Sequence, residues 1–324
     1  GTTTFRPPYT PVRYGAIAGR GISRFFDPVR KTPLHYWHER FGAQFENVGQ
    51  WKRAWYYPEK DEDFQETINR ESLMARHGVA ITDASTLGKI DIKGPDAAKL
   101  LNRVYTNAWL KLPVGRCRYG LMLGEDGMLM DDGVTARLAE NHYLMHTTTG
   151  NAASVMAWLD RWIQTEWPDL EVYLTSVTEH WATLSIVGPL SRAVVGAVCD
   201  DIDFSNDSFP FMSVRSGTVS GVPARIFRIS FSGELTYEIN VQSNYARGVW
   251  EACLKAGEEY GIKPYGTEVM HVLRAEKGFV IIGQDTDGSV TPMDAGMNYM
   301  VNRHKDFLGK RSLYRSEMLR DDRK

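Results

Sequence analysis

Cysteine is scarce in this 324-residue sequence, in which Cys117, Cys199 and Cys253 are an odd number at wide spacings. They form neither a zinc motif nor a disulfide framework, and they favour a reducing, cytoplasmic setting. The longest hydrophobic runs, such as residues 278–283, fall far below the roughly 18 residues that suggest a membrane span. The first residues, GTTTFRPPYTPV, have neither the basic nor the apolar region of a secretory signal. We therefore expect neither a membrane segment nor secretion.

An excess of charge of one sign is absent too. Lysine and arginine number 38 and aspartate and glutamate number 40, so the formal net charge is −2. This balance argues against a nucleic-acid-binding surface. Hydrophobic residues make up 43% and charged residues 24%, which excludes a disordered, collagenous or coiled-coil protein. The length is that of an enzyme with about two domains.

Residues 1–60 differ in texture from the rest of the chain. They hold six of the 14 prolines together with many aromatic residues and glycines, and they show little periodicity. Such a segment is typical of an extended lead-in that wraps over a surface. From residue 61 onwards the patterns become regular.

Two stretches of the chain share one order of predicted elements. The first, 61–180, contains helix 63–77, strand 88–93, helix 96–104, hairpin 118–123 and 128–136, strand 142–147 and helix 152–167. The second, 181–315, contains strand 182–187, helix 190–198, hairpin 224–231 and 235–241, and helix 244–260. In each, a Gly-Pro pair opens the first helix after the strand. This order predicts an α+β protein with a duplicated unit related to the split βαβ motif, followed by a short tail, 316–324.

The duplication places two carboxylates in matching positions. Asp132 lies five residues beyond the turn glycine Gly127, and Glu238 lies five residues beyond Gly233. Both are therefore on the second arms of hairpins that the repeat makes equivalent. If the two sheets pack side by side, both carboxylates could face one shared crevice, the natural pocket of such a fold.

Strand alternation treats the two carboxylates differently. Asp132 falls on an apolar side of its strand, where an ionised carboxylate is costly unless it is paired. The alternative is that Asp131 and Asp132 lie solvated at a bulge or strand end. Glu238 alternates with apolar neighbours and shares a face with Thr236 and Asn240, which favours a solvated face.

Other candidate sites are weaker. His142 and His146 share one strand face, but no acidic or sulfur ligand accompanies them in the sequence, so we expect no metal site. Residues 35–39, HYWHE, match no zinc pattern. Arg274 and Glu276 stand where a helix ends, and the simplest interpretation is that they tie this end to a neighbouring loop.

Several segments resemble the glycine-cleavage T-protein (aminomethyltransferase) family. They are 78–107, 124–134 (GEDGMLMDDGV), 231–241 (FSGELTYEINV), 272–297 and 304–313, so the resemblance covers about residues 50–315. Within this family, residues 1–12, 51–58 and 266–279 are most similar to the carboxy-terminal region of the α subunit of heterotetrameric sarcosine oxidases. The resemblance implies duplicated split βαβ (ferredoxin-like) units of the aminomethyltransferase folate-binding fold. It also implies a small terminal β-barrel, which this sequence lacks.

The resemblance also implies a tetrahydrofolate site. The catalytic aspartate of the family matches Asp132, and its pterin-binding glutamate matches Glu238, which replaces the solvated-face interpretation. Tyr143 and Thr147 fall where the family lines the folate site, and Tyr119 is a further candidate for the wall around the ring. Many members carry an arginine where this chain has Met270, so part of the folate must be held differently.

The implied reaction is the capture of a one-carbon unit. A flavin on a partner β-like subunit would oxidise sarcosine to an imine, and this chain, which shows no flavin-binding fingerprint, would use tetrahydrofolate to yield 5,10-methylenetetrahydrofolate and glycine. Asp132 would act as the base. Two alternatives are also folate-dependent enzymes but take the one-carbon unit from a different donor. They are a free-standing aminomethyltransferase and a dimethylglycine-oxidase-type folate domain. A third is a non-catalytic docking module for a flavoprotein subunit.

Overall fold

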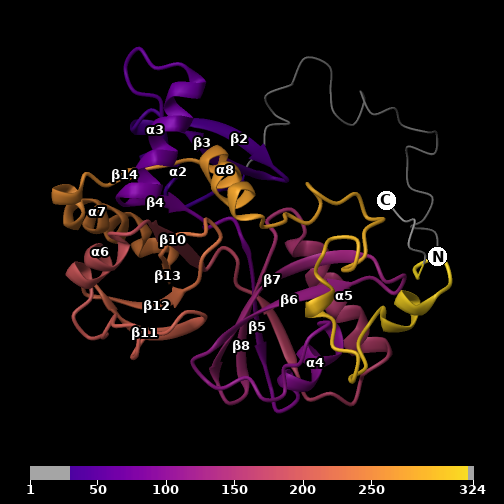
Figure 1. The fold of residues 1–324 in the computed structure, drawn as a ribbon. Helices are drawn as coiled ribbons and strands as arrows, with labels where there is room; N and C mark the ends of the chain where they lie inside the picture. Colours follow the sequence, from indigo (N-terminus) through magenta and orange to yellow (C-terminus); the bar gives the residue numbers. More distant parts are fainter. Residues whose placement is uncertain (1–29, 320–324) are drawn as a thin grey trace, which may run out of the picture.

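The computed structural model describes residues 30–319 (Figure 1). Residues 1–29 of the predicted lead-in and 320–324 of the predicted tail lie outside the described residues. The helices are α2 (His35–Arg40), α3 (Phe64–His77), α4 (Ala97–Val104), α5 (Ala152–Thr165), α6 (Ser191–Val198), α7 (Ala246–Ala256) and α8 (Thr267–Lys277). Short 3₁₀ turns are η3 (Ser243–Tyr245), η4 (Glu258–Tyr260), η5 (Asn298–Met300) and η6 (Lys310–Tyr314). None of the helices within residues 30–319 has the length and hydrophobicity of a transmembrane segment.

The strands of residues 30–319 form three sheets. A small sheet has the order β1 (Arg30–Lys31), β3 (Trp51–Tyr56), β2 (Gln44–Val48). A five-stranded sheet has the order β6 (Cys117–Leu123), β7 (Leu129–Ala139), β8 (His142–Thr147), β5 (Gly88–Lys93), β9 (Tyr173–Ser176). A six-stranded sheet has the order β11 (Ser213–Val219), β12 (Val222–Arg228), β13 (Thr236–Gln242), β10 (Trp181–Val187), β4 (Ala80–Asp83), β14 (Lys263–Pro264).

Local signals explain where several elements begin and end. α3 begins after a capping box, in which Asp63 Oδ1 accepts from the Glu66 backbone and Glu66 Oε2 accepts from the Asp63 backbone. Strands β5 and β8 span the predicted residues, and they pair antiparallel from Gly88 with Thr147 to Lys93 with His142. Both Gly-Pro pairs precede a helix, as predicted.

The two large sheets follow the same path, which confirms two similar sheets. In each, a strand and a helix are followed by three consecutive antiparallel strands, a second helix and a short strand. Each sheet thus contains a split βαβ motif with an additional edge strand, β6 in one sheet and β11 in the other. The place beside the first strand is taken by β9 in the five-stranded sheet and by β4 in the six-stranded sheet, where β14 lies outside β4. The predicted equivalence of the two hairpins is wrong, because β6–β7 corresponds to β11–β12, whereas the second predicted hairpin is β12–β13. β11 has no strong sequence signal, because it is a polar edge strand that contains Gly217.

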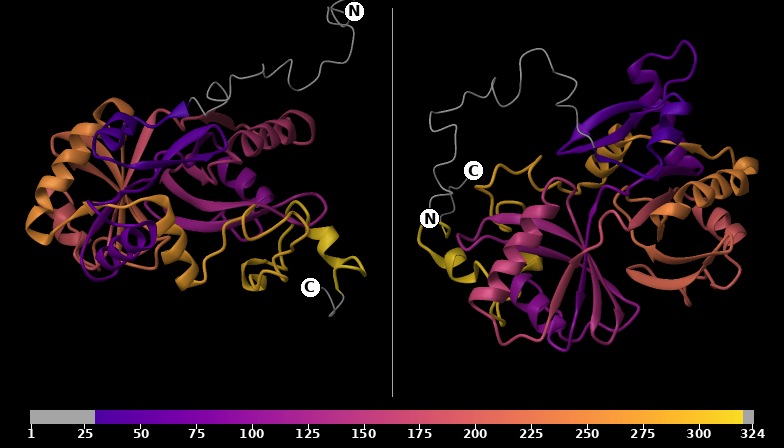
Figure 2. Two further views of the ribbon diagram at one scale, coloured as in Figure 1. Left: turned by 90° about the horizontal axis from the view of Figure 1, so that it is seen from above. Right: turned by 180° about the vertical axis from the view of Figure 1, so that it is seen from behind.

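Two predicted segments differ in the structure. Residues 30–60 are not extended, because they form α2 and the small sheet, and Trp37 and Tyr57 are buried in the core of the six-stranded sheet. The predicted first unit is divided, because α3 packs against α8 and β4 pairs with β10 of the six-stranded sheet. In the other direction, the chain after α8 runs to the five-stranded sheet (Figure 2), where Ile282 and Phe307 pack on Leu121.

Each large sheet has a helix-covered face and an inner face. α4 and α5 cover one face of the five-stranded sheet, and α6 and α7 cover one face of the six-stranded sheet. We call the opposite face of each sheet its inner face. The inner faces contact each other, because Leu144 and Ala136 of one share a core with Phe227 of the other. Figure 1 shows the two sheets side by side.

Candidate functional site

Asp132 lies on the inner face of the five-stranded sheet, and its side chain is 8% exposed. Its cross-strand neighbour is Leu121 of β6, and Tyr119 donates a hydrogen bond of 2.7 Å from its phenol oxygen to Asp132 Oδ2. Gly120, between Tyr119 and Leu121 on β6, faces aromatic rings in the core beneath α4. Because side chains alternate along a strand, Tyr119 and Leu121 face the opposite, inner side, as Asp132 does. A register shift at Met122 and Leu123 interrupts the strand pair before Asp132.

Burial changes the acidity of this carboxyl group. Removal from water raises the pKa of Asp132 to about 6, and the hydrogen bond from Tyr119 opposes this shift because it favours the ionised form. The pKa of Tyr119 is raised by burial and by the charge of Asp132, so the phenol stays protonated. A buried carboxylate whose pKa lies near neutral pH can accept a proton from a bound substrate.

Asp131 points to the opposite side of the sheet. It is fully buried, pairs across the strands with Met122, and its Oδ1 accepts a hydrogen bond of 2.7 Å from Thr148 Oγ1. Burial raises its pKa to about 7. The alternative that Asp131 and Asp132 form a solvated acidic pair is therefore wrong.

Glu238 lies on the inner face of the six-stranded sheet, on β13. It pairs with Ser185 of β10 and Phe227 of β12, and it is 8% exposed. Burial raises its pKa to about 7, and the positive charge of Lys89 opposes this shift. The solvated-face interpretation of the alternation is wrong for Glu238, because the second sheet covers the face that the sequence pattern leaves polar.

Lys89 is a fully buried cation on β5 that sequence reasoning missed. Its ammonium group donates hydrogen bonds of 2.9 and 3.0 Å to the backbone oxygens of Ser85 and Leu87. Burial lowers its pKa to about 7, and the negative charges of Asp83 and Glu238 oppose this shift. The alternation in GKIDIK puts Lys89 on the polar side of the strand with Asp91 and Lys93, so the sequence carries no signal that Lys89 is buried.

Buried polar groups without partners lie around this pair of charges. Several buried side-chain atoms of the described residues have no partner, and four of them lie here: Asn240 Nδ2 and Oδ1, Thr183 Oγ1 and His146 Nε2. We call Lys89, His146, Thr183, Glu238 and Asn240 the inter-sheet polar layer. The His146 ring stays neutral, because burial and the charge of Lys89 lower its pKa to about 4. Each unsatisfied buried group costs about 1–3 kcal/mol, so such a cluster is typical of a place where a polar ligand binds.

Tyr143 and Thr147 lie on the other face of the five-stranded sheet. Tyr143 belongs to the core beneath α4 and α5, and the guanidinium of Arg137 lies 5.4 Å from the centre of its ring. Thr147 and Ala152, the first residue of α5, both lie close to Gly88. The structure therefore brings Tyr119 together with Asp132 but separates Tyr143 and Thr147 from it, and their contact with folate stays a prediction.

The position of Met270 on α8 is next to a guanidinium. Arg53 Nη2 lies 4.0 Å from Met270 Sδ, and Arg53 Nε is buried without a partner among residues 30–319. Burial lowers the pKa of Arg53, and the charge of Glu46 opposes this shift. A cation from β3 therefore stands beside the place where the family resemblance implied one on α8.

The other motifs have structural roles. His38 of HYWHE lies between Tyr57 Oη, at 2.8 Å, and Asp83 Oδ2, at 3.1 Å. His142 has the acidic neighbour that the sequence did not reveal, because Asp91 Oδ1 lies 3.0 Å from its Nε2. Even so, residues 30–319 contain no group of three or more His, Cys, Asp or Glu side chains that could hold a metal ion.

The predicted tie at the end of α8 is confirmed. Arg274 donates to the backbone oxygen of Phe279 and pairs with Asp285. Glu276 binds Arg76 of α3 at 2.6 Å. These contacts fix the start of the segment that continues to the five-stranded sheet.

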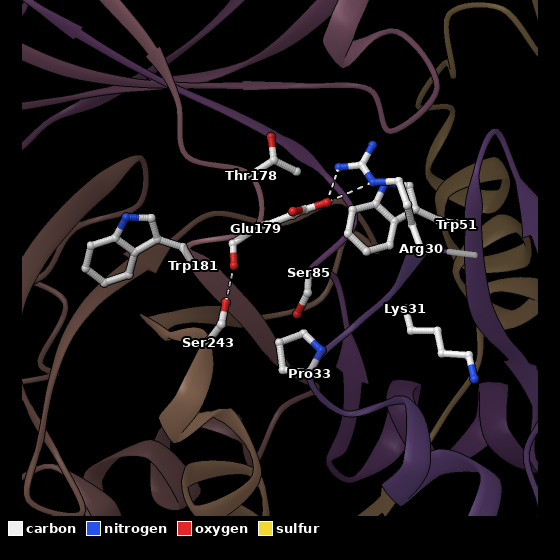
Figure 3. A pocket seen from close by; sticks show the side chains of 9 residues that line it. All are labelled: Arg30, Lys31, Pro33, Trp51, Ser85, Thr178, Glu179, Trp181 and Ser243. Atoms are coloured by element: carbon white, nitrogen blue, oxygen red, sulfur yellow. Dashed lines mark hydrogen bonds and ion pairs between the residues drawn. The ribbon is translucent and has the colours of Figure 1, made fainter. Parts of the chain in front are cut away.

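An open cavity of about 440 Å³ lies at the start of β10 (Figure 3). Trp51 and Trp181 contribute to its walls, and Arg30 lies over the Trp51 ring and binds Glu179 at 2.8 Å. None of the predicted site residues lines this cavity. Ser85 connects it to the inter-sheet polar layer, because Ser85 lines the cavity and its backbone oxygen accepts from Lys89.

Comparisons with known proteins agree on one family. The family model described as "GCVT N-terminal domain" matches residues 34–305. Sarcosine oxidase subunit alpha from Corynebacterium sp. (strain P-1) is 59% identical over the whole chain, which covers 34% of that protein, and its namesake from Rhizobium meliloti (strain 1021) is 46% identical, with 33% covered. The chain thus spans about a third of the length of these relatives. An aminomethyltransferase from Corynebacterium aurimucosum is 31% identical over 86% of this chain and 72% of its own.

A solved structure confirms the predicted fold class. The crystal structure of glycine cleavage system aminomethyltransferase T from Bartonella henselae superimposes with a TM-score of 0.76 at 25% identity. The match covers 88% of this chain and 73% of the other. The α+β fold predicted from the sequence is therefore present, and the strands of residues 30–319 form no closed barrel.

Proposed function

This chain belongs to the family of the GCVT N-terminal domain, and we propose that it binds a tetrahydrofolate and transfers a one-carbon unit to it. The observation that carries this proposal is the inter-sheet polar layer. There, two packed sheets enclose a carboxylate, Glu238, among polar atoms without partners, and Asp132 stands on the same inner side.

Glu238 fits the role of binding the pterin ring. A pterin presents a ring N–H and an amino group side by side, and a carboxylate accepts both in parallel. Lys89 helps to keep Glu238 ionised near neutral pH, because its positive charge lowers the pKa of Glu238. Arg53, which stands beside Met270, is suited to hold a carboxylate of the ligand.

Asp132 fits the role of the base. Tetrahydrofolate, when bound, supplies the nitrogen nucleophiles that take up the one-carbon unit. A folate nitrogen is nucleophilic only when unprotonated, so Asp132 would accept its proton or stabilise the developing positive charge. Tyr119 holds this carboxylate in place through its hydrogen bond. Burial of Asp132 limits water, which would otherwise hydrolyse an imine to formaldehyde.

For the donor, we propose the imine that forms when a flavin on a partner β-like subunit oxidises sarcosine. The products would be 5,10-methylenetetrahydrofolate and glycine, made in the cytoplasm. This donor is supported by the identity of 46–59% to sarcosine oxidase subunits alpha, against 31% to an aminomethyltransferase. A free-standing aminomethyltransferase or a dimethylglycine-oxidase-type domain would share the same residues and differ in the donor.

Calorimetric titration of the chain with tetrahydrofolate tests the proposal. Glu238→Gln keeps the shape of the side chain and removes its charge, so we expect affinity to fall about 30- to 1000-fold. Glu251→Gln is the matched control, because Glu251 is an exposed residue on α7 that pairs with its helix neighbour Arg247. Its affinity should equal that of the wild type.

Two outcomes would contradict the proposal. If the wild-type chain gives neither binding heat nor thermal protection with tetrahydrofolate, it is better described as a docking module for a flavoprotein. If the wild-type chain binds and Glu238→Gln binds equally well, the assignment of the pterin to Glu238 is wrong.

A further inference from the structure

Asn240 has two hydrogen-bonding atoms and uses neither within the described residues. Its side chain is 0% exposed, and both Nδ2 and Oδ1 lack a partner. It follows Glu238 by two residues on β13, so both side chains project from the inner face of the six-stranded sheet. Its cross-strand neighbour Thr183 is also fully buried, and Thr183 Oγ1 also lacks a partner.

Such an arrangement is costly for the protein alone. An amide buried without partners loses its hydrogen bonds to water and gains none in exchange, which destabilises the folded chain. An apolar side chain of the same shape would avoid that cost. A buried amide with both atoms unpaired therefore points to a ligand that supplies one donor and one acceptor together.

The spacing along β13 matches the size of one fused ring. Residues two apart on a strand are about 6.7 Å apart, and their side chains stand side by side on one face. A ring whose edge is bound by Glu238 would therefore present its neighbouring edge to Asn240. On a tetrahydropterin, one of the edges next to the paired N–H donors carries N1, an acceptor, and N8–H, a donor, on a shared carbon.

We propose that Asn240 pairs with the N1 and N8–H edge of the pterin and so determines specificity for a reduced, N8-protonated ring. This inference rests on the proposed function. The amide donates from Nδ2 to N1 and accepts at Oδ1 from N8–H. An ionised carboxylate lacks the donor for this pair of parallel bonds, and a hydroxyl group lacks the second atom. Glu238 and Asn240 together then read two adjacent edges of the same ring.

The test compares two ligands on two proteins. The ligands are tetrahydrofolate and 8-deazatetrahydrofolate, in which a CH₂ group replaces N8–H. By calorimetry, the wild-type chain should prefer tetrahydrofolate about tenfold or more, because the analogue leaves Oδ1 of Asn240 unpaired. Asn240→Leu, of similar shape but apolar, should prefer it by about twofold or less. An equal preference in both proteins would overturn the inference.

Thermal unfolding of the ligand-free chain separates ligand recognition from a structural role. Asn240→Leu removes two unsatisfied buried groups, so its Tm should be unchanged or higher by about 1–3 °C while its affinity for tetrahydrofolate falls. A lower Tm together with the lost preference would show that Asn240 supports the fold and would overturn the inference. If the wild-type chain binds neither ligand, it is the proposed function that fails.

Discussion

Tyr119 and Asp132 lie on neighbouring strands, β6 and β7, and the phenol of Tyr119 donates a hydrogen bond of 2.7 Å to Asp132 Oδ2. Asp132 is buried and Tyr119 is half-buried on the inner face of their sheet, where residues of segment 280–301 join the hydrophobic cluster that contains Leu121. Hydrogen bonding to the charged form of a carboxyl group favours that form. Burial raises the pKa of Asp132, and the hydrogen bond from Tyr119 lowers it, so Tyr119 extends towards acid the pH range in which this carboxyl group is ionised.

Replacing Tyr119 with Phe should move the acid limb of the transfer reaction to higher pH. Only the ionised form of Asp132 accepts a proton, so wild-type transfer should fall as the pH drops through about 6, the pKa of Asp132. Removal of the hydrogen bond raises this pKa, by about one unit if the bond contributes about 1.4 kcal/mol. The measurement is the pH profile of single-turnover methylene transfer in the full assembly, from pH 5 to 8.

Asp132→Asn is the control for this profile. It should retain folate affinity within about tenfold, since a base acts mainly in the transition state, and its residual transfer should show no limb near pH 6. If the acid limb of Tyr119→Phe lies at the same pH as that of the wild type, or at lower pH, the role of the Tyr119 hydrogen bond is contradicted.

Lys89→Met should make folate binding more sensitive to acid. The positive charge of Lys89 lowers the pKa of Glu238, so its removal raises that pKa above about 7. In the proposed site the ionised form of Glu238 accepts the pterin N–H groups, so affinity at pH 7 should fall and recover at higher pH. Calorimetric titrations between pH 6 and 9 measure the midpoint, which should lie at higher pH in the variant.

Lys93→Met is the matched control, because Lys93 is an exposed lysine on the same strand, β5. Its midpoint should be that of the wild type. An unshifted midpoint in Lys89→Met would mean that Lys89 serves only to bind the carbonyl groups of Ser85 and Leu87.

The regular elements could be predicted because their signals are local. Residues 88–93 and 142–147 alternate in polarity between turn residues, and both became strands with those bounds. The sequence patterns did not predict β4, in contrast, because its four residues form a strand by pairing with β10, about 100 residues further along the chain. β11 was missed because an edge strand needs few apolar residues and gives little alternation.

The site was predicted only in part, because alternation tells which residues share a face but not what covers that face. Glu238 and Asn240 were correctly placed together, yet the pattern favoured solvent where the second sheet lies. The repeat argument reached Glu238 through a wrong equivalence. When the two large sheets are aligned on their Gly-Pro pairs, the strand pairing places Glu238 at the position that Leu144 has in the five-stranded sheet. Thus the fold is duplicated, but the carboxylates are not.

The stability of the chain should depend on pH through Glu71, a fully buried residue of α3. Its carboxylate accepts hydrogen bonds from the backbones of Tyr57, at 2.7 Å, and Gly266, at 2.9 Å, which joins β3 to the start of α8. Burial nevertheless raises its pKa from 4.5 to about 7. A raised folded-state pKa gives stability that is fully present below pH 4.5 and is lost as the pH rises through 7.

Glu71→Gln removes this titration, so the variant should gain stability relative to the wild type as the pH rises from 4.5 to 7. The gain should be on the order of 3 kcal/mol, the equivalent of the pKa shift, in the free energy of unfolding measured with denaturant. Glu62→Gln is the control, because Arg70 lowers the pKa of Glu62 to about 2, and its effect should be constant across this range. A difference between Glu71→Gln and wild type that stays flat from pH 4.5 to 7 would mean that the two backbone hydrogen bonds fully compensate the burial of the charge.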